Sequence, residues 1–241
     1  MNDGPGDSVR PTRPRALVVD LFGTLVPKWS TELSTGARRR MANHIGAEEH
    51  AFHEAWRVRW LDRELGRIGL EENMSEVVQC VAPGAGPGAV AALIEIWVGH
   101  VKEQLRPRPD ALEVLEAAKT SGLRVGLLSN AGPTVPPLFR EGPLGRLVDC
   151  AVFSCTAGIA KPDPRIYAAV FRELVVPPAA CLYVGDGADE ELQGAESAGM
   201  TPVLLRVDSE IEREGFPPGA AAWHGAVIGA FADVRGHLQL D

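Results

Sequence analysis

The spacing of hydrophobic residues changes character twice along the chain. Residues 16–19 form a short, wholly apolar run that stops at Asp20, a pattern typical of a strand buried on both faces. From residue 30 to residue 105, apolar residues recur every three or four positions, which predicts helices. Beyond residue 106, short apolar runs alternate with helical segments, which indicates a parallel sheet with helices on both faces. The pattern therefore predicts an α/β fold with a helical insertion after its first strand.

Four helices are expected in the insertion, with no strand between them. They are predicted to run from Ser30 to a stop at Gly46, through Phe52 to Leu65, over residues 75–81, and over residues 90–105. The last of them has the clearest amphipathic stripe. We therefore expect residues 29–105 to form a four-helix domain, residues 16–28 and 106–241 to form a Rossmann-like core, and residues 1–15 to be a disordered tail.

Four further strands are expected after the insertion, at residues 123–128, 151–153, 181–184 and 202–207, with helices at 110–120, 165–174 and 190–198. Each crossover between parallel strands is right-handed, so the carboxyl ends of all strands face the same edge of the sheet. Ligands of open α/β sheets bind at that edge. Because Asp20, Ser129 and Asp186 stand at the ends of predicted strands, we expect them to converge there.

Composition and charge exclude several classes of partner. The 241 residues are 45% hydrophobic and 23% charged, which is enough to bury a substantial core. A net charge of −8 argues against nucleic acid and anionic membranes, which bind through an excess of Lys and Arg. No apolar run approaches the roughly 20 residues of a membrane span. The four cysteines form no Cys-x-x-Cys pair and stand mostly in apolar runs, so we expect reduced, buried thiols and a cytoplasmic location.

Four short motifs follow one another in the predicted core: Asp20-x-x-Gly23-Thr24, Ser129-Asn130, Lys161-Pro162 and Gly185-Asp186-(x)4-Glu191. Together they resemble the four motifs of the haloacid dehalogenase-like (HAD) hydrolase superfamily, and the resemblance covers nearly the whole chain after Arg15. The helical insertion resembles the superfamily's four-helix, C1-type cap in its commonest position. The resemblance implies a hydrolase that works through a covalent aspartyl intermediate.

The motif residues suit that chemistry. A carboxylate such as Asp20 can attack phosphorus or carbon and hold the fragment covalently until water releases it. Lys161 supplies a positive charge that offsets the nucleophile and the transferring oxygens. The residues expected to bind phosphate offer a close backbone, hydroxyl groups, an N–H at a strand end or a cation: Gly23, Thr24, Ser129, Asn130 and Lys161.

The fourth motif bears on the choice of reaction. Carboxylates crowded at one edge repel each other unless a cation lies among them, and Mg²⁺ prefers such hard oxygen ligands. The predicted Mg²⁺ ligands are Asp20, the backbone carbonyl of Phe22, Asp186 and Glu191, the last directly or through a water molecule. In the superfamily the equivalent set binds Mg²⁺ in phosphatases, whereas its dehalogenases need no metal and carry Ser-Ser-Asn where this chain has Gly-Asp-Gly. The motif thus favours a phosphatase that acts on a small phosphorylated metabolite.

One position departs from the phosphatase pattern. Superfamily phosphatases usually carry a second Asp two residues after the nucleophile, which protonates the leaving group and then activates water. Here that residue is Phe22, and an aromatic residue at this position resembles the dehalogenases. Phe22 can donate no proton, so the proton comes from elsewhere, or the substrate has a good leaving group, or turnover is slow. A metal-independent 2-haloacid dehalogenase and a weakly active or non-catalytic phosphate-binding relative therefore stay open as alternatives.

The insertion is expected to close over the crevice and to govern specificity. Its candidate substrate contacts are Trp29, Trp56, Arg57, Arg59, Trp60 and Arg63. The alternative is that the three arginines form the solvated face of a helix whose tryptophans lie in the core. The sequence leaves open the identity of the substrate and the choice between a monomer and a homodimer.

Overall fold

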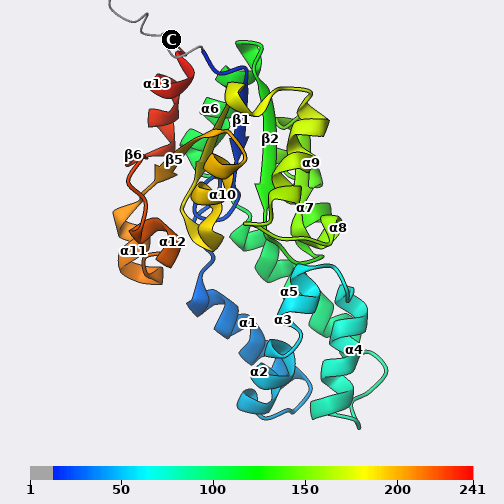
Figure 1. Cartoon of the computed structure of the whole chain (residues 1–241). Helices are drawn as coiled ribbons and strands as arrows, with labels where there is room; N and C mark the ends of the chain where they lie inside the picture. The colour runs from blue at the N-terminus through cyan, green and yellow to red at the C-terminus, as the bar shows by residue number, and fades with distance from the viewer. Residues whose placement is uncertain (1–12, 241) are drawn as a thin grey trace, which may run out of the picture.

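The computed structural model describes residues 13–240 and contains one sheet of six parallel strands (Figure 1). The strand order is β3-β2-β1-β4-β5-β6. The strands are β1 (Ala16–Val19), β2 (Arg124–Ser129), β3 (Cys150–Phe153), β4 (Cys181–Gly185), β5 (Thr201–Leu205) and β6 (Ala226–Ile228). The prediction of a Rossmann-like parallel sheet is confirmed, and β6 is an edge strand that was not predicted.

Helices cover both faces of the sheet. Leu17 and Val19 of β1 belong to the apolar core of one face, and Ala16 and Val18 belong to that of the other. Successive side chains of a strand point to opposite faces, so the wholly apolar β1 is buried on both. The first face is covered by α6 (Pro109–Thr120), α7 (Val135–Glu141) and α13 (Val234–Leu238), and the second by α9 (Pro164–Leu174) and α10 (Glu191–Ser197). The remaining short elements of the core are η1 (Leu144–Arg146), α8 (Ser154–Ala157), η2 (Pro178–Ala180), η3 (Ala188–Glu190), α11 (Asp208–Glu214), α12 (Pro218–Ala221) and η4 (Phe231–Asp233).

The segment between β1 and α6 forms a group of helices beyond the carboxyl ends of the strands (Figure 1). We refer to these helices as the insertion: α1 (Thr31–His44), α2 (Glu49–Arg57), α3 (Trp60–Glu64), α4 (Leu70–Val81) and α5 (Ala89–Gln104). Four of them, α1, α2, α4 and α5, share an apolar cluster, which includes Met41, Phe52, Trp56, Met74 and Leu93. The insertion therefore has a hydrophobic cluster of its own, which meets the core of one sheet face through α5.

The prediction of four helices in this segment is wrong by one. The helix expected over residues 52–65 is two helices, because α2 ends at Arg57 and Arg59 leaves helical geometry with φ −98° and ψ 12°. Leu61, which appeared to continue the apolar stripe, is 47% exposed, so the spacing did not mark one buried face. The next helix, α4, begins at Leu70 rather than near residue 75.

The N-terminal segment and the cysteines differ in part from what the sequence predicts. Residues 1–12 of the expected tail lie outside the described residues, whereas Arg13 and Arg15 hydrogen-bond to carbonyls of the core. Cys181 is buried as expected, but Cys80 is exposed because it lies on the outward side of α4, so the expectation of a buried thiol is wrong there. No helix within residues 13–240 has the length and apolar character needed to cross a membrane.

Candidate active site

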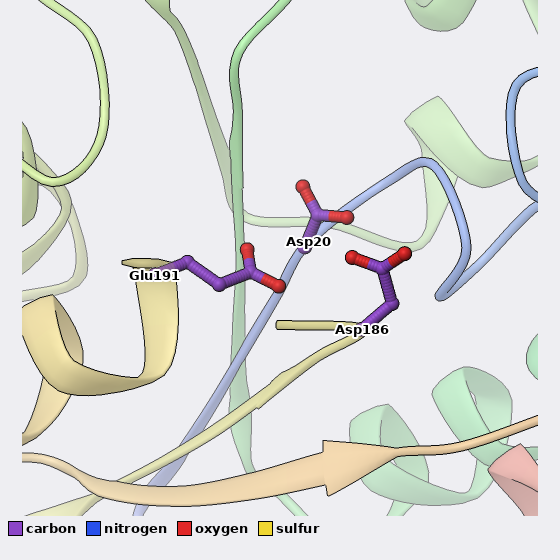
Figure 2. A group of neighbouring side chains, drawn as sticks. All are labelled: Asp20, Asp186 and Glu191. Carbon is purple, nitrogen blue, oxygen red and sulfur yellow. The ribbon is translucent and has the colours of Figure 1, made fainter. Parts of the chain in front are cut away.

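Three carboxylates meet beyond the ends of β1 and β4. Asp20 follows β1, Asp186 follows β4, and the two strands pair in parallel. The N–H of Asp20 donates to the carbonyl of Val184 at 2.9 Å, which fixes the two strand ends relative to each other. Glu191 begins α10 and reaches the same place. Figure 2 shows the three carboxylates pointing toward one another, and each offers an oxygen within 4.8 Å of the others.

Lys161 lies between two of these carboxylates. Its Nζ is 2.7 Å from Oδ1 of Asp20 and 2.5 Å from Oε2 of Glu191, and all three side chains are almost fully buried. Glu191 accepts two more hydrogen bonds, from the Tyr183 hydroxyl at 2.7 Å and from the backbone N–H of Gly187 at 2.9 Å. Glu191 therefore holds the ammonium group of Lys161 against the candidate nucleophile.

Burial governs protonation at this site. It raises the pKa of Asp20 and of Glu191, the charge of Lys161 opposes that shift, and the neighbouring carboxylates add to it. Burial acts to lower the pKa of Lys161, but Asp20 and Glu191 outweigh it and raise that pKa, so the ammonium stays charged. A further cation beside Asp20 would favour the ionised form of this carboxylate.

Lys28 provides a second positive charge, which the sequence analysis did not single out. Its Nζ lies 3.2 Å from Oδ2 of Asp186 and donates to the carbonyl of Gly215 at 3.2 Å. The backbone N–H of Lys28 donates to Oε2 of Glu210 at 3.0 Å, and Glu210 also pairs with Arg108 at 2.7 Å. Lys28 is thus fixed by groups from distant parts of the chain, and no local sequence pattern predicts its place in the site.

The turn after β1 brings its backbone close to Asp186. Gly23 has φ +78°, and a Cβ there would overlap the Asp186 carboxylate, so this position requires glycine. The buried Thr24 directs its hydroxyl toward Oδ2 of Asp20, at a long 3.4 Å. Of the five predicted phosphate-binding residues, Thr24 therefore lies beside the candidate nucleophile and Gly23 lies beside Asp186.

Ser129 and Asn130 end β2, the other neighbour of β1. The Ser129 hydroxyl is buried and has no hydrogen-bond partner within residues 13–240. The Asn130 side chain accepts from the N–H of Lys161 at 2.8 Å and donates to its carbonyl at 3.3 Å and to Asp189 at 2.8 Å. Ser129 thus has a free donor for a ligand, whereas the Asn130 side chain positions Lys161.

A cavity of about 310 Å³ separates the insertion from the core. It is lined by five aromatic residues (Phe22, Trp29, Trp56, Trp60 and Trp97), by the charged Arg38, Arg63 and Glu64, and by residues 130–135 after β2, with Val101. The Phe22 ring meets Trp29 edge to face, with 5.0 Å between ring centroids. The aromatic residue in place of the usual second Asp therefore forms part of an apolar wall of this cavity.

The candidate contacts of the insertion divide between the cavity and the surface. Trp29, Trp56, Trp60 and Arg63 line the cavity. Arg63 is buried, its guanidinium lies 4.1 Å from the Trp56 ring centroid, and its Nη1 donates to the Trp56 carbonyl at 2.7 Å. Arg57 and Arg59 are exposed and pair with acidic residues of the surface. The alternative of a solvated face therefore describes these two arginines but not Arg63.

Three further residues were missed because their positions depend on tertiary structure. Tyr183 lies in the apolar run of β4, and its buried hydroxyl bonds to Glu191. A buried phenol usually has a hydrogen-bond partner, and this was the one sign in the sequence that Tyr183 has a polar contact. Lys28 is a single lysine in a loop, and Glu64 is one of many acidic residues in the insertion. Their neighbours are far away in the sequence, so neither spacing nor composition could identify them.

Comparison with known proteins yields matches over most of the chain. A family model described as haloacid dehalogenase-like hydrolase matches residues 14–199. A glyceraldehyde 3-phosphate phosphatase of Methanopyrus kandleri is 28% identical over 203 residues, which are 80% of this chain and 84% of that protein. An (S)-2-haloacid dehalogenase 4A of Burkholderia cepacia is 28% identical over 215 residues, which are 85% of each chain.

A solved structure agrees in fold. The crystal structure of CbbY from Rhodobacter sphaeroides in complex with phosphate superposes with a TM-score of 0.59, at 21% identity, over 94% of this chain and 100% of that chain. At this level of identity the likeness concerns the fold. The relatives similar in sequence include both phosphate and haloacid hydrolases, so the reaction must be argued from the site.

Proposed function

Because the chain belongs to the haloacid dehalogenase-like hydrolases, we propose that it is a Mg²⁺-dependent phosphatase of a small phosphorylated metabolite. The observation that carries the proposal is the cluster of Asp20, Asp186 and Glu191, whose oxygens come within 4.8 Å of one another (Figure 2). A divalent cation among these carboxylates would offset their mutual repulsion. The insertion serves as the cap over this site, and the enzyme works in the cytoplasm.

The residues of the cluster fit a hard divalent cation. Asp20 and Asp186 offer carboxylate oxygens on two adjacent strand ends, which is the donor type that Mg²⁺ prefers. The missing side chain of Gly23 leaves the space that the Asp186 carboxylate uses. The carbonyl of Phe22 completes the proposed ligand set, and Glu191, which already holds Lys161, interacts through a water molecule. When bound, Mg²⁺ supplies positive charge to the phosphate oxygens.

The chain's own groups account for the steps. A carboxylate oxygen of Asp20 attacks phosphorus, the bond to the leaving oxygen breaks, and a phosphoaspartate forms. Lys161, held by Glu191, offsets the charge that develops on the transferring oxygens. The free hydroxyl of Ser129 donates to a phosphate oxygen. Water then attacks the phosphorus and releases phosphate.

A metal-independent 2-haloacid dehalogenase is the second candidate. Phe22 in place of an acid favours it, because displacement of a halide from carbon needs no proton on the leaving group. The ion pair between Lys28 and Asp186 favours it too, since an ammonium group at 3.2 Å balances the carboxylate without a metal. The relative from Burkholderia cepacia carries that activity in its name.

Metal dependence separates the two candidates. Protein treated with chelator should regain hydrolysis of phosphate esters when Mg²⁺ is added, and its melting temperature should rise, because a ligand that binds only the folded state stabilises it. The gain is about 2.7 kcal/mol at a concentration 100 times the Kd. Asp186→Asn should lose both effects. Turnover of 2-haloacids in chelator, together with a melting temperature that Mg²⁺ leaves unchanged, would select the dehalogenase.

The nucleophile is tested by the mass of the intermediate. Acid-quenched protein should carry one phosphoryl group during turnover, and Asp20→Asn should carry none and should lose turnover by about 10⁴-fold or more. The amide is nearly isosteric with the carboxylate, so circular dichroism should show an unchanged fold. Substantial residual activity of this variant, with deamidation excluded by mass, contradicts the role of Asp20.

A further inference from the structure

The proposed phosphatase needs a proton for its leaving group, and Phe22 cannot supply one. The acids of the carboxylate cluster are engaged otherwise. Glu191 accepts hydrogen bonds from Lys161, Tyr183 and Gly187, and Asp186 pairs with Lys28. The proton must therefore come from a group outside the cluster, or the enzyme must do without it.

Glu64 offers a carboxyl group in the cavity that Phe22 also lines. It is the last residue of α3 and lines the cavity together with Phe22 and Asn130, so it faces the strand ends from the side of the insertion. Two residues later, Gly66 meets the backbone carbonyl of Cys155 so closely that a Cβ would not fit. This contact ties the end of α3 to α8 of the core, and it keeps the Glu64 side chain at the cavity.

The surroundings of Glu64 suit a group that gives and takes a proton. Within residues 13–240 its half-buried carboxyl has no ion pair and no hydrogen bond. Burial raises its pKa from 4.5 to about 7; Asp189 adds to the rise, and Lys161 opposes it. At this end of α3, Asp62 and Arg67 pair with each other, and the Cys155 thiol stays neutral because burial raises its pKa to about 11. Near pH 7, Glu64 is present in both forms.

We propose that Glu64 of the insertion is the general acid and base of this enzyme, in place of the carboxyl group absent at Phe22. The inference rests on the proposed phosphatase function. As Asp20 bonds to phosphorus and the ester bond breaks, the Glu64 carboxyl gives its proton to the leaving oxygen. The resulting carboxylate then takes a proton from water, the water oxygen bonds to phosphorus, and the bond to Asp20 breaks. Phosphate leaves, and Glu64 is again protonated.

The test compares two aromatic phosphates whose leaving groups differ in their need for a proton. Benzyl phosphate expels an alkoxide and needs the acid, whereas p-nitrophenyl phosphate expels a stable phenolate. Glu64→Gln keeps the shape of the side chain but cannot transfer a proton. We expect kcat/KM, which reports the step that expels the leaving group, to fall about 10²- to 10⁴-fold for benzyl phosphate in this variant and to change little for p-nitrophenyl phosphate. The kcat values of both esters should fall, because hydrolysis of the phosphoaspartate also uses Glu64.

A matched control and a rescue accompany this test. Glu54→Gln makes the same chemical change in α2, where Glu54 pairs with Arg57 on the surface away from the cavity, and it should leave both rates unchanged. Phe22→Asp, added to Glu64→Gln, returns an acid to the usual position and should restore turnover of benzyl phosphate. A merely structural role of Glu64 would not be rescued by an acid at residue 22.

The pH dependence gives a second readout. In the wild type, kcat/KM for benzyl phosphate should fall above a pH of about 7 as Glu64 ionises, and this limb should be absent from Glu64→Gln. The raised pKa also affects folding. The folded state holds this proton above pH 4.5, where the unfolded chain loses it, so stability relative to Glu64→Gln should fall as the pH rises from 4.5 to about 7.

The outcomes separate the two proposals. If the wild type hydrolyses both esters and Glu64→Gln keeps the wild-type kcat/KM for benzyl phosphate, or loses kcat/KM for both esters to the same extent without rescue, then Glu64 is not the acid and the phosphatase function stands. If the wild type hydrolyses no phosphate ester in the presence of Mg²⁺, the proposed function fails, and the role of Glu64 fails with it.

Discussion

Two lysines set the charge balance of the active site at the scale of single residues. Lys161 bridges Asp20 and Glu191, and Lys28 pairs with Asp186, so the three carboxylates face two ammonium groups. The backbone of Lys161 is held by two hydrogen bonds with the Asn130 side chain. Lys28 comes from a loop and keeps 14% of its side chain exposed, so it is the cation that a metal ion can displace.

Lys28→Met should tighten the binding of Mg²⁺. An ammonium group beside Asp186 repels a divalent cation by about 2 kcal/mol even with the dielectric constant of water, so we expect the Kd to fall about tenfold or more. Isothermal titration measures the change, and Lys28→Arg, which keeps the charge, serves as the control. An unchanged Kd together with loss of metal-independent 2-haloacid turnover would instead mean that Lys28 takes the place of a metal.

At the scale of elements, the strand ends were predictable and the side-chain network between them was not. The apolar run of β1, its abrupt end at Asp20 and the alternation after residue 106 were sufficient for the sheet and for the convergence of Asp20, Ser129 and Asp186. A sequence pattern reports which face of an element is buried, because burial repeats with the period of that element. The break between α2 and α3 could not be predicted in this way, because it depends on tertiary contacts. Arg63 of α3 donates to the Trp56 carbonyl, and Gly66 meets the Cys155 carbonyl of α8. Such contacts leave no periodicity in the sequence.

The hydrogen bonds of the Asn130 side chain could not be predicted from the sequence. Its side chain bonds to both backbone groups of Lys161 and to Asp189, so it joins the end of β2 to the loop that carries the lysine. Asn130→Ala should cost about 1–3 kcal/mol of stability, since the part-buried backbone groups of Lys161 lose their hydrogen bonds. It should also lower kcat, because the ammonium group is no longer fixed beside Asp20. Chemical denaturation and initial rates test both, and an unchanged kcat in a destabilised variant would contradict the positioning role.

At the scale of the whole molecule, the cavity lies where the apolar cluster of the insertion meets that of one sheet face, and Trp97 of α5 packs against both clusters. The insertion packs around Met41 and Leu93, the sheet packs around its own two layers, and the chain crosses between them twice. The two crossings lie side by side, because the N–H of Arg108 donates to the carbonyl of Leu25 at 2.9 Å and its Nε donates to that of Thr24 at 2.9 Å. The insertion is therefore attached next to the candidate nucleophile, and a shift of the insertion alters the cavity and the contacts of Trp97 and Val101 with the sheet core.

Because tryptophans form most of the aromatic wall, intrinsic tryptophan fluorescence should report ligand binding in the cavity. Four of the protein's five tryptophans line the cavity, and Trp29, Trp97 and Trp56 follow one another with ring centroids 6.2 Å and 4.7 Å apart. Titrating Asp20→Asn, which binds without turnover, with benzyl phosphate should therefore change tryptophan fluorescence strongly, and inorganic phosphate should change it little. The optical Kd should equal the calorimetric one. Fluorescence that stays constant while calorimetry reports saturation would mean that the aromatic ring of the ligand lies outside this wall.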